Sequence, residues 1–111
     1  MSEARMNKLA DVLVNYSVKV KPGDWVYINS SIVAMPLMKE VYRQVLKAGG
    51  NPTTFISDDD LIEIYFKEAS DDQISWISPT SKLLYEKADV MIHLRGAKNT
   101  RSLSGVDPKK Q

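Results

Sequence analysis

The sequence predicts a three-layer α/β fold in which helices flank a small and mainly parallel β-sheet. Three short apolar segments alternate with longer segments of helical periodicity, and this alternation is typical of parallel strands joined by helices. The apolar segments are almost unbroken in apolar character, as in strands that are covered on both faces. Proline and glycine mark the segment boundaries, so the 111 residues are predicted to form one α/β domain, residues 1–111.

The first helix is predicted from about Glu3 to Val18, because apolar residues recur there three and four positions apart. The residues of this stripe are Met6, Leu9, Ala10, Leu13 and Val14. "KPGD" follows and indicates a type II turn, with Pro22 supplying a fixed φ and Gly23 a permissive one. "WVYINS", residues 25–30, is then expected to be an inner parallel strand.

The second helix is predicted after a polar joint at residues 30–31, with Pro36 near its start and Gly49 as its stop. Its apolar stripe is formed by Met38, Val41, Tyr42, Val45 and Leu46. "PTTFIS", residues 52–57, is the second predicted strand. Strand, helix and strand together form a crossover unit that we expect to be right-handed.

Two or three short helices are predicted between Asp58 and residue 88. Ser70 and Gln73 have the spacing of a capping box, and Ser78 is a helix cap followed by Pro79 at the first helical position. "DVMIHLRG", residues 89–96, is the third strand.

Composition excludes several classes of function. Apolar residues make up 43% of the chain and charged residues 26%, and the net charge is +1 from 15 basic and 14 acidic side chains. This balance predicts neither nucleic acid nor a membrane surface as a partner. The absence of cysteine rules out disulfides and thiolate zinc sites within these residues. No secretion signal or membrane span is recognised, so we expect a cytoplasmic protein.

Few residues present themselves as catalysts. Asp58, Asp59 and Asp60 follow the second strand and could bind a divalent cation, but capping of the next helix is the favoured interpretation. His93 is the sole histidine and is expected to be structural. Trp25, Trp76, the tyrosines and the methionines are expected to pack in the core. No phosphate-binding glycine motif is present.

One polar stretch is not required by folding. "RGAKNTRSLSG", residues 95–105, follows the third strand and should lie at the edge of the sheet where ligands bind. It offers Lys98, Asn99, Thr100 and Arg101 as hydrogen-bond donors for a carboxylate or a carbonyl oxygen. A solvated loop leading to a further helix is the simpler interpretation.

Three stretches taken in order resemble the amino-terminal domain of the M29 (thermophilic) metallo-aminopeptidases. They are "YSVKVKPGDWVYINSS", "PLMKEVYRQVLKAGGNP" and "ADVMIHLRGAKNTRSLSGVDPKK", and the likeness extends from about Leu9 to Lys110. The resemblance implies a two-domain cytoplasmic enzyme, usually a homodimer, that removes amino-terminal residues from peptides. It also implies two divalent metal ions that activate a water for attack on the scissile carbonyl.

The resemblance places every metal ligand and catalytic residue in a carboxyl-terminal domain, and none of the ligands maps onto this sequence. It therefore implies that the chain is the amino-terminal piece of a longer peptidase, inactive and without bound metal by itself. The piece would form one wall of the substrate cleft, or a gate over it, and would contact its own catalytic domain. Our hypothesis is that Asn99, Thr100 and Arg101 face that cleft. Asp107 and Pro108 resemble the start of a helix, of which residues 108–111 are expected to be frayed here.

Two other classes of function fit the residues. One is a small-ligand-binding or phospho-receiver-like α/β domain that would use Asp58–Asp60 and Lys98 at the strand ends. The other is a non-catalytic oligomerisation module.

Overall fold

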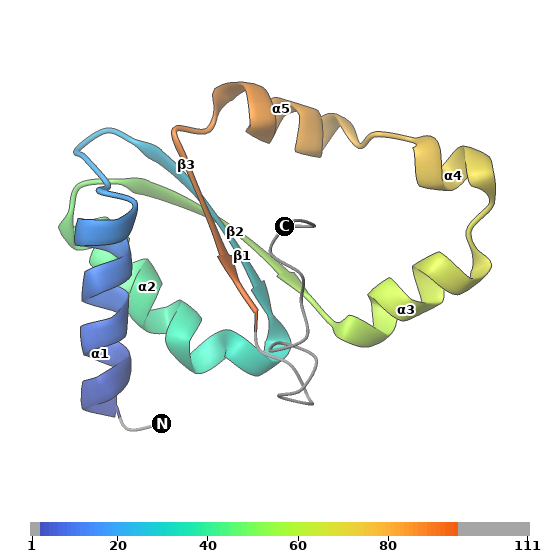
Figure 1. Ribbon diagram of the computed structural model, residues 1–111. Coiled ribbons are helices and arrows are strands. Elements are labelled where there is room, and N and C mark those ends of the chain that lie inside the picture. Colours follow the sequence, from blue (N-terminus) through green and yellow to red (C-terminus); the bar gives the residue numbers. More distant parts are fainter. Residues whose placement is uncertain (1–2, 96–111) are drawn as a thin grey trace.

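A three-stranded parallel sheet forms the centre of the computed structural model, which describes residues 3–95 (Figure 1). The strands are β1 (Trp25–Ser31), β2 (Asn51–Ser57) and β3 (Val90–Leu94), and their spatial order is β2-β1-β3. Both neighbours of β1 run parallel to it. The predicted fold class is therefore confirmed, and β1 is the inner strand as its apolar character indicated.

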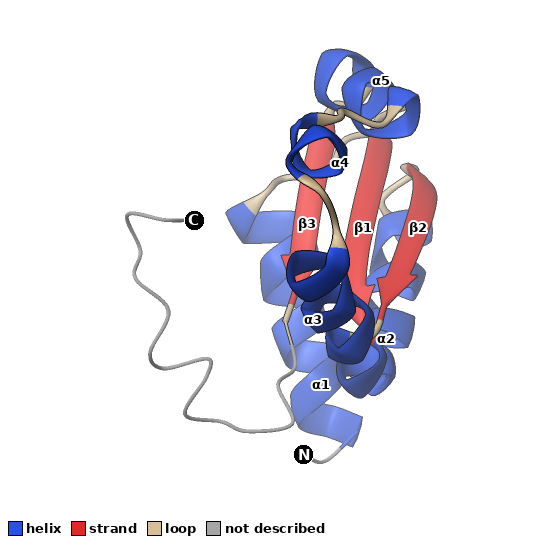
Figure 2. Ribbon diagram, turned by 90° about the vertical axis from the view of Figure 1, so that its right-hand side faces the viewer, coloured by secondary structure: helices blue, strands red, loops and turns tan. Residues whose placement is uncertain are grey.

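The helices form two layers, one on each side of the sheet (Figure 2). The first layer contains α1 (Glu3–Asp11), the π-helical turn η1 (Val12–Ser17), the short 3-10 helix η2 (Ile32–Ala34) and α2 (Met35–Lys47). The second contains α3 (Asp59–Glu68), α4 (Asp71–Ser75) and α5 (Pro79–Lys87). The connection from β1 to β2 and the connection from β2 back across to β3 run in opposite directions. Right-handed crossovers must then lie on opposite faces, as observed.

The hydrophobic core lies between the sheet and the first layer. Val26 and Ile28 of β1 are fully buried there, together with Val41 and Val45 of α2. The other buried members are Ala10, Val14, Val20, Met38, Ile92 and Leu94. The predicted helical stripes supply this core, except that Leu9, Tyr42 and Leu46 at their margins remain exposed. Within residues 3–95 no helix is both long and apolar enough to cross a membrane.

The first helix changes its winding before it ends. We predicted one helix over residues 3–18, and the structure has α1 followed by the π-helical turn η1. The amide of Val18 donates to the carbonyl of Leu13, five residues back, at 3.0 Å, which is the π-helical pattern. The amide of Val20 then donates to the carbonyl of Val14 at 2.9 Å. This wider turn brings Val14 and Val20 into the same core.

The two predicted glycine positions are confirmed and lie side by side. Gly23 has φ 88°, and the amide of Asp24 donates to the carbonyl of Lys21 at 3.0 Å, as in a type II turn. Gly49, with φ 87°, ends α2, and its carbonyl accepts a hydrogen bond from the amide of Gly23 at 2.9 Å. The turn before β1 is thus joined to the end of α2.

Gly49→Ala is expected to cost more stability than Gly23→Ala. Both residues have a left-handed φ, which costs an L-residue about 1–2 kcal/mol. A Cβ at Gly49 would also lie 3.0 Å from the Cα of Pro22, whereas a Cβ at Gly23 has nothing within 4 Å. Overpacking adds about 1 kcal/mol or more at Gly49. Urea denaturation of both variants measures the difference, and equal losses would contradict the contact argument.

The predicted helix caps of the second layer are present. The carboxylate of Asp58 accepts a hydrogen bond from the amide of Asp60 at 3.1 Å. Ser70 and Gln73 form the reciprocal capping box, with distances of 3.2 and 2.9 Å. Ser78 accepts from the amide of Thr80 at 3.2 Å. These short helices therefore begin where local hydrogen-bonding chemistry specifies.

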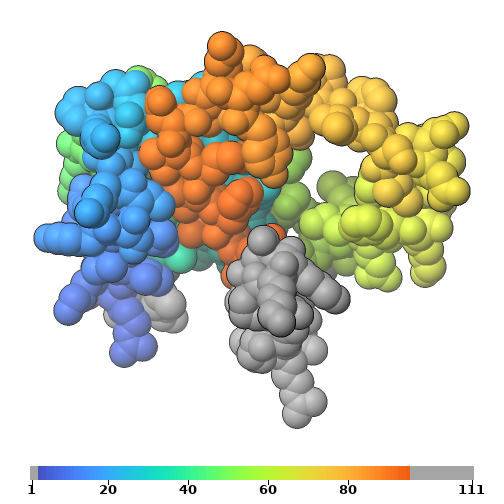
Figure 3. Space-filling view, turned by 45° about the horizontal axis from the view of Figure 1, so that its top comes forward, coloured from blue at the N-terminus to red at the C-terminus, as the bar shows by residue number. Residues whose placement is uncertain are grey.

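The second layer does not close over the sheet, and this corrects one prediction. We call α3, α4, α5 and their joints, residues 59–87, the arm. The space-filling view shows an opening between the α3 and α4 part of the arm and the rest of the molecule, whereas α5 lies against it (Figure 3). Trp76 is 68% exposed and Tyr85 is 76% exposed, so the expectation that such aromatic residues pack in the core is wrong here. Leu84 is the arm's buried apolar side chain.

Candidate functional site

The carboxyl ends of the strands lie together at one edge of the sheet, which is where open α/β sheets bind ligands. In the order β2-β1-β3 the chain reverses its direction of winding between β1 and β3, and the crevice for a ligand forms at that switch point. Ser30 of β1 lies opposite Leu94 of β3 there. The candidate site is therefore the edge beyond Ser30 and Leu94.

The serine side chains at the carboxyl end of β1 have a structural role. Ser30 is fully buried, and its hydroxyl donates to the carbonyl of Ser31 at 2.9 Å. Ser31 is also buried. A buried hydroxyl needs a hydrogen-bond partner, and this one is satisfied locally. Ser30 therefore shapes the end of the strand.

The acidic cluster after β2 serves α3. The hydrogen bond from the Asp60 amide to Asp58 confirms the capping interpretation, and Asp59 and Asp60 lie in the first turn, where acidic residues complement the helix dipole. Among residues 3–95 no three acidic or histidine side chains are grouped so that they could hold a metal ion. The described residues do not fit a metal centre, and no metal chemistry is assigned to them.

His93 lies on the sheet face that points away from α1 and α2. Because side chains alternate along a strand, His93 and Tyr27 share this face, whereas Ile28 and Ile92 point into the core. The rings of His93 and Tyr27 meet edge to face, with centroids 6.4 Å apart and planes at 78°. His93 is exposed, so its observed role is packing on Tyr27.

Tyr27 is the titratable group that this face perturbs. Burial raises the pKa of its phenol above 10.0, because the charged phenolate loses hydration; a hydrogen bond with Asn29 opposes the shift and nearby Tyr85 adds to it. Its side chain is 8% exposed. The phenol therefore stays protonated and neutral at physiological pH.

The predicted cleft residues Asn99, Thr100 and Arg101 lie outside the described residues, as do Lys98 and residues 108–111. The structure does fix where the chain leaves the sheet on its way to them. Leu94, the last residue of β3, is in register with Ser30 of β1. The chain therefore leaves the sheet beside the switch point.

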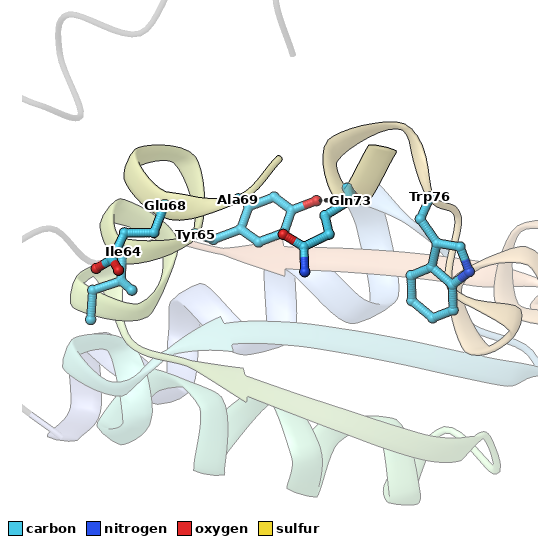
Figure 4. Close-up of a pocket in the computed structure, with 6 residues that line it drawn as sticks. All are labelled: Ile64, Tyr65, Glu68, Ala69, Gln73 and Trp76. Atoms are coloured by element: carbon cyan, nitrogen blue, oxygen red, sulfur yellow. Dashed lines mark hydrogen bonds between the residues drawn. The ribbon is translucent and has the colours of Figure 1, made fainter. Parts of the chain in front are cut away.

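A hollow of about 620 Å³ in the arm was not predicted. Its lining residues are Ile64, Tyr65, Glu68, Ala69, Gln73 and Trp76 (Figure 4). The Tyr65 hydroxyl donates to the carbonyl of Gln73 at 2.9 Å and ties α3 to α4. A signal for it was present in the sequence, because "LIEIYF" places apolar residues around most of α3 and leaves more than one stripe to be covered.

These observations define the chain as a small parallel α/β domain. The carboxyl ends of its strands form an edge of the kind that binds ligands, and its own helices leave one sheet face partly open. The chain belongs to the thermophilic metalloprotease (M29) family, whose sequence model matches residues 2–111. The family predicted from the three sequence stretches is thus confirmed, and with it a metallopeptidase lineage that implies use of divalent metal.

The solved structure of wild-type AmpT from Thermus thermophilus is similar to this chain, with a TM-score of 0.67 and 17% sequence identity. The match covers 97% of this chain and 28% of the AmpT chain, so this chain spans less than a third of the length of that protein. At this identity the likeness establishes a shared fold. No curated protein matches the sequence.

Proposed function

We propose that this chain is the amino-terminal domain of a metal-dependent aminopeptidase that removes N-terminal amino acids from peptides. The observation that carries the proposal is the match of the metalloprotease family over residues 2–111. The coverage of 28% of the AmpT chain supports the idea that the complete enzyme contains considerably more polypeptide. In this proposal the complete enzyme acts on peptides, is located in the cytoplasm and forms a homodimer.

The two-metal catalytic centre is assigned to a carboxyl-terminal domain. This assignment is supported by residues 3–95, where no cluster of three ligand side chains is available. Metal ions in such a centre polarise a carbonyl and generate a nucleophilic water. The contribution of the present domain is to form one wall of the substrate cleft and to contact that catalytic domain.

Asn99, Thr100 and Arg101 are the proposed cleft residues. Their support is the position of the strand that leads to them, since β3 ends at Leu94 beside Ser30 and the switch point of the sheet. Ligands gather at this place in parallel α/β sheets. Side-chain amide, hydroxyl and guanidinium groups suit the carbonyl oxygens and the carboxylate of a peptide.

Arg101→Ala in the complete enzyme is expected to lower kcat/KM for peptides about tenfold or more, because a hydrogen bond from a charged donor contributes about 1.5–3 kcal/mol. The melting temperature should hardly change, since the proposed role of Arg101 is to bind the peptide and not to hold the fold. Lys21→Ala, in the turn at the opposite edge of the sheet, is the control and should leave kcat/KM unaltered. An unaltered kcat/KM in the Arg101 variant would count against the cleft role.

The general test is release of leucine from a leucyl peptide by the complete polypeptide and by the 111-residue chain. We expect metal-dependent release from the complete polypeptide and none from the chain. The reading frame is expected to continue past Gln111 for roughly 250–300 residues with clustered Glu, His, Tyr and Asp. A frame that stops at Gln111, or robust activity of the short chain, would contradict the proposal.

A further inference from the structure

The arm and the sheet face opposite to it form an apolar surface that is not covered by the described chain. On the sheet, Phe55 of β2 is 52% exposed. On the arm, Ile64 is 51%, Tyr65 42% and Trp76 68% exposed. Gln73 and Trp76 extend from the arm toward the side on which the strands lie (Figure 4). We call these arm residues, together with the exposed sheet residues Phe55 and His93, the open face.

The open face exposes more apolar side chains than the surface of a soluble monomeric domain usually does. A soluble monomer rarely exposes a contiguous apolar patch larger than a few hundred Å², and larger patches mark contact sites. Parallel sheets are normally covered on both faces, and here the first layer covers one face over β1 and β3, where Val26, Ile28 and Ile92 are buried. Within the arm, the Tyr65 to Gln73 hydrogen bond ties α3 to α4. An element between arm and sheet would complete the third layer.

We propose that the open face is the docking surface for the carboxyl-terminal part of the same polypeptide, which inserts an apolar element between the arm and the sheet. The proposal rests on the proposed function, which requires that further polypeptide. Apolar side chains of that element enter the hollow beside Trp76 and Tyr65, where Glu68 is the one charged lining residue. The surface therefore selects an apolar occupant.

Two observations favour this occupant over a second copy of the chain. The matched region is 28% of the AmpT chain, so an enzyme of that length has ample polypeptide to supply the covering element. The edge strand β3, which is part of the open sheet, also leads directly into the carboxyl-terminal residues 96–111 of the chain. A tether at this point gives the following segment a high effective concentration, on the order of millimolar, at the surface.

Trp76→Lys and Tyr16→Lys form a matched pair for the test, because both side chains are 68% exposed in the chain. Tyr16 lies in η1, in the layer on the other side of the sheet. In the complete polypeptide, Trp76→Lys is expected to lower the melting temperature by about 5 °C or more, because it places a charge in an apolar contact. Tyr16→Lys should shift it little, and in the 111-residue chain neither variant should shift it appreciably.

Amide hydrogen exchange supplies a second measurement if the lysine variant does not fold. Exchange over residues 59–77 should be at least about tenfold slower in the complete polypeptide than in the 111-residue chain, because the docked element covers the arm. Equal exchange, or equal melting of the two variants in the complete polypeptide, would overturn the proposal. A 111-residue chain that sediments as a dimer, and that Trp76→Lys converts to a monomer, would assign the open face to a second copy instead.

These readouts are independent of the peptidase assay. An active, metal-dependent enzyme in which Trp76→Lys behaves like Tyr16→Lys would overturn the docking proposal and leave the function standing. A complete polypeptide that is destabilised by Trp76→Lys, but that releases no amino acid, would overturn the proposed function and leave the docking proposal standing.

Discussion

Removal of divalent metal from the complete polypeptide is expected to lower the proposed aminopeptidase activity by about a thousandfold or more. Metal ions lower the barrier for attack on a carbonyl by several kcal/mol, and each 1.4 kcal/mol corresponds to about a factor of ten in rate. Release of leucine from a leucyl peptide, measured before and after dialysis against a chelator, gives the size of the effect. Activity should return when a divalent metal is added back.

The 111-residue chain is the matched control for this experiment. A ligand stabilises a fold only when it binds the folded state, and residues 3–95 contain no group of three ligand side chains for a metal. The melting temperature of the 111-residue chain should therefore be the same with chelator, without chelator and with added metal. A melting temperature that rises with metal would place a binding site in this domain and would contradict the proposed assignment of the metal centre to a carboxyl-terminal domain.

Ile28→Ala is expected to destabilise the 111-residue chain by about 2–5 kcal/mol, the range for a large apolar side chain removed from a core. Ile28 is fully buried in the central strand, between Thr54 of β2 and Ile92 of β3 in register. The neighbours are strands and packed valines, which relax little into the cavity. Since a domain of this size has a total stability of about 5–15 kcal/mol, the variant should lose a large fraction of it. Urea denaturation followed by circular dichroism measures the change.

Two further substitutions make this prediction specific. Ile28→Val removes one methylene group and should cost about 0.5–1.5 kcal/mol. Ile77→Ala alters a residue of the arm that is 70% exposed, and it should change the stability of the 111-residue chain by less than about 0.5 kcal/mol. Comparable losses for Ile28→Ala and Ile77→Ala would show that the core does not lie between β1 and the first layer.

The elements that the sequence predicts correctly are those set by local chemistry. Gly23 takes a positive φ because a type II turn requires one, and Ser70 caps α4 because its hydroxyl reaches an amide three residues on. The apolar stripe of α2 likewise contains its buried residues Val41 and Val45. The interactions concerned span only a few residues, so they can be deduced from the order of the residues.

The exposed arm could not be predicted in this way. A helical stripe of apolar residues has the same spacing whether it packs on a core or remains exposed. Trp76 and Tyr85 were expected inside for this reason, and both are exposed. The π-helical turn was missed as well, because the hydrogen bond from the Val18 amide to Leu13 is decided by how Val14 and Val20 enter the core.

The candidate site also has a part that could be predicted from the sequence and a part that could not. The sequence by itself determined the family, the strands, the turns and the caps, because these depend on residue identities and short spacings. The tertiary structure alone decided the strand order β2-β1-β3, hence the switch point beside Ser30 and Leu94, and the separation of α3 and α4 from the sheet. Strand order and layer packing arise from contacts between residues far apart in the chain. The energies of those contacts depend on which surfaces meet, and the local pattern carries no record of that.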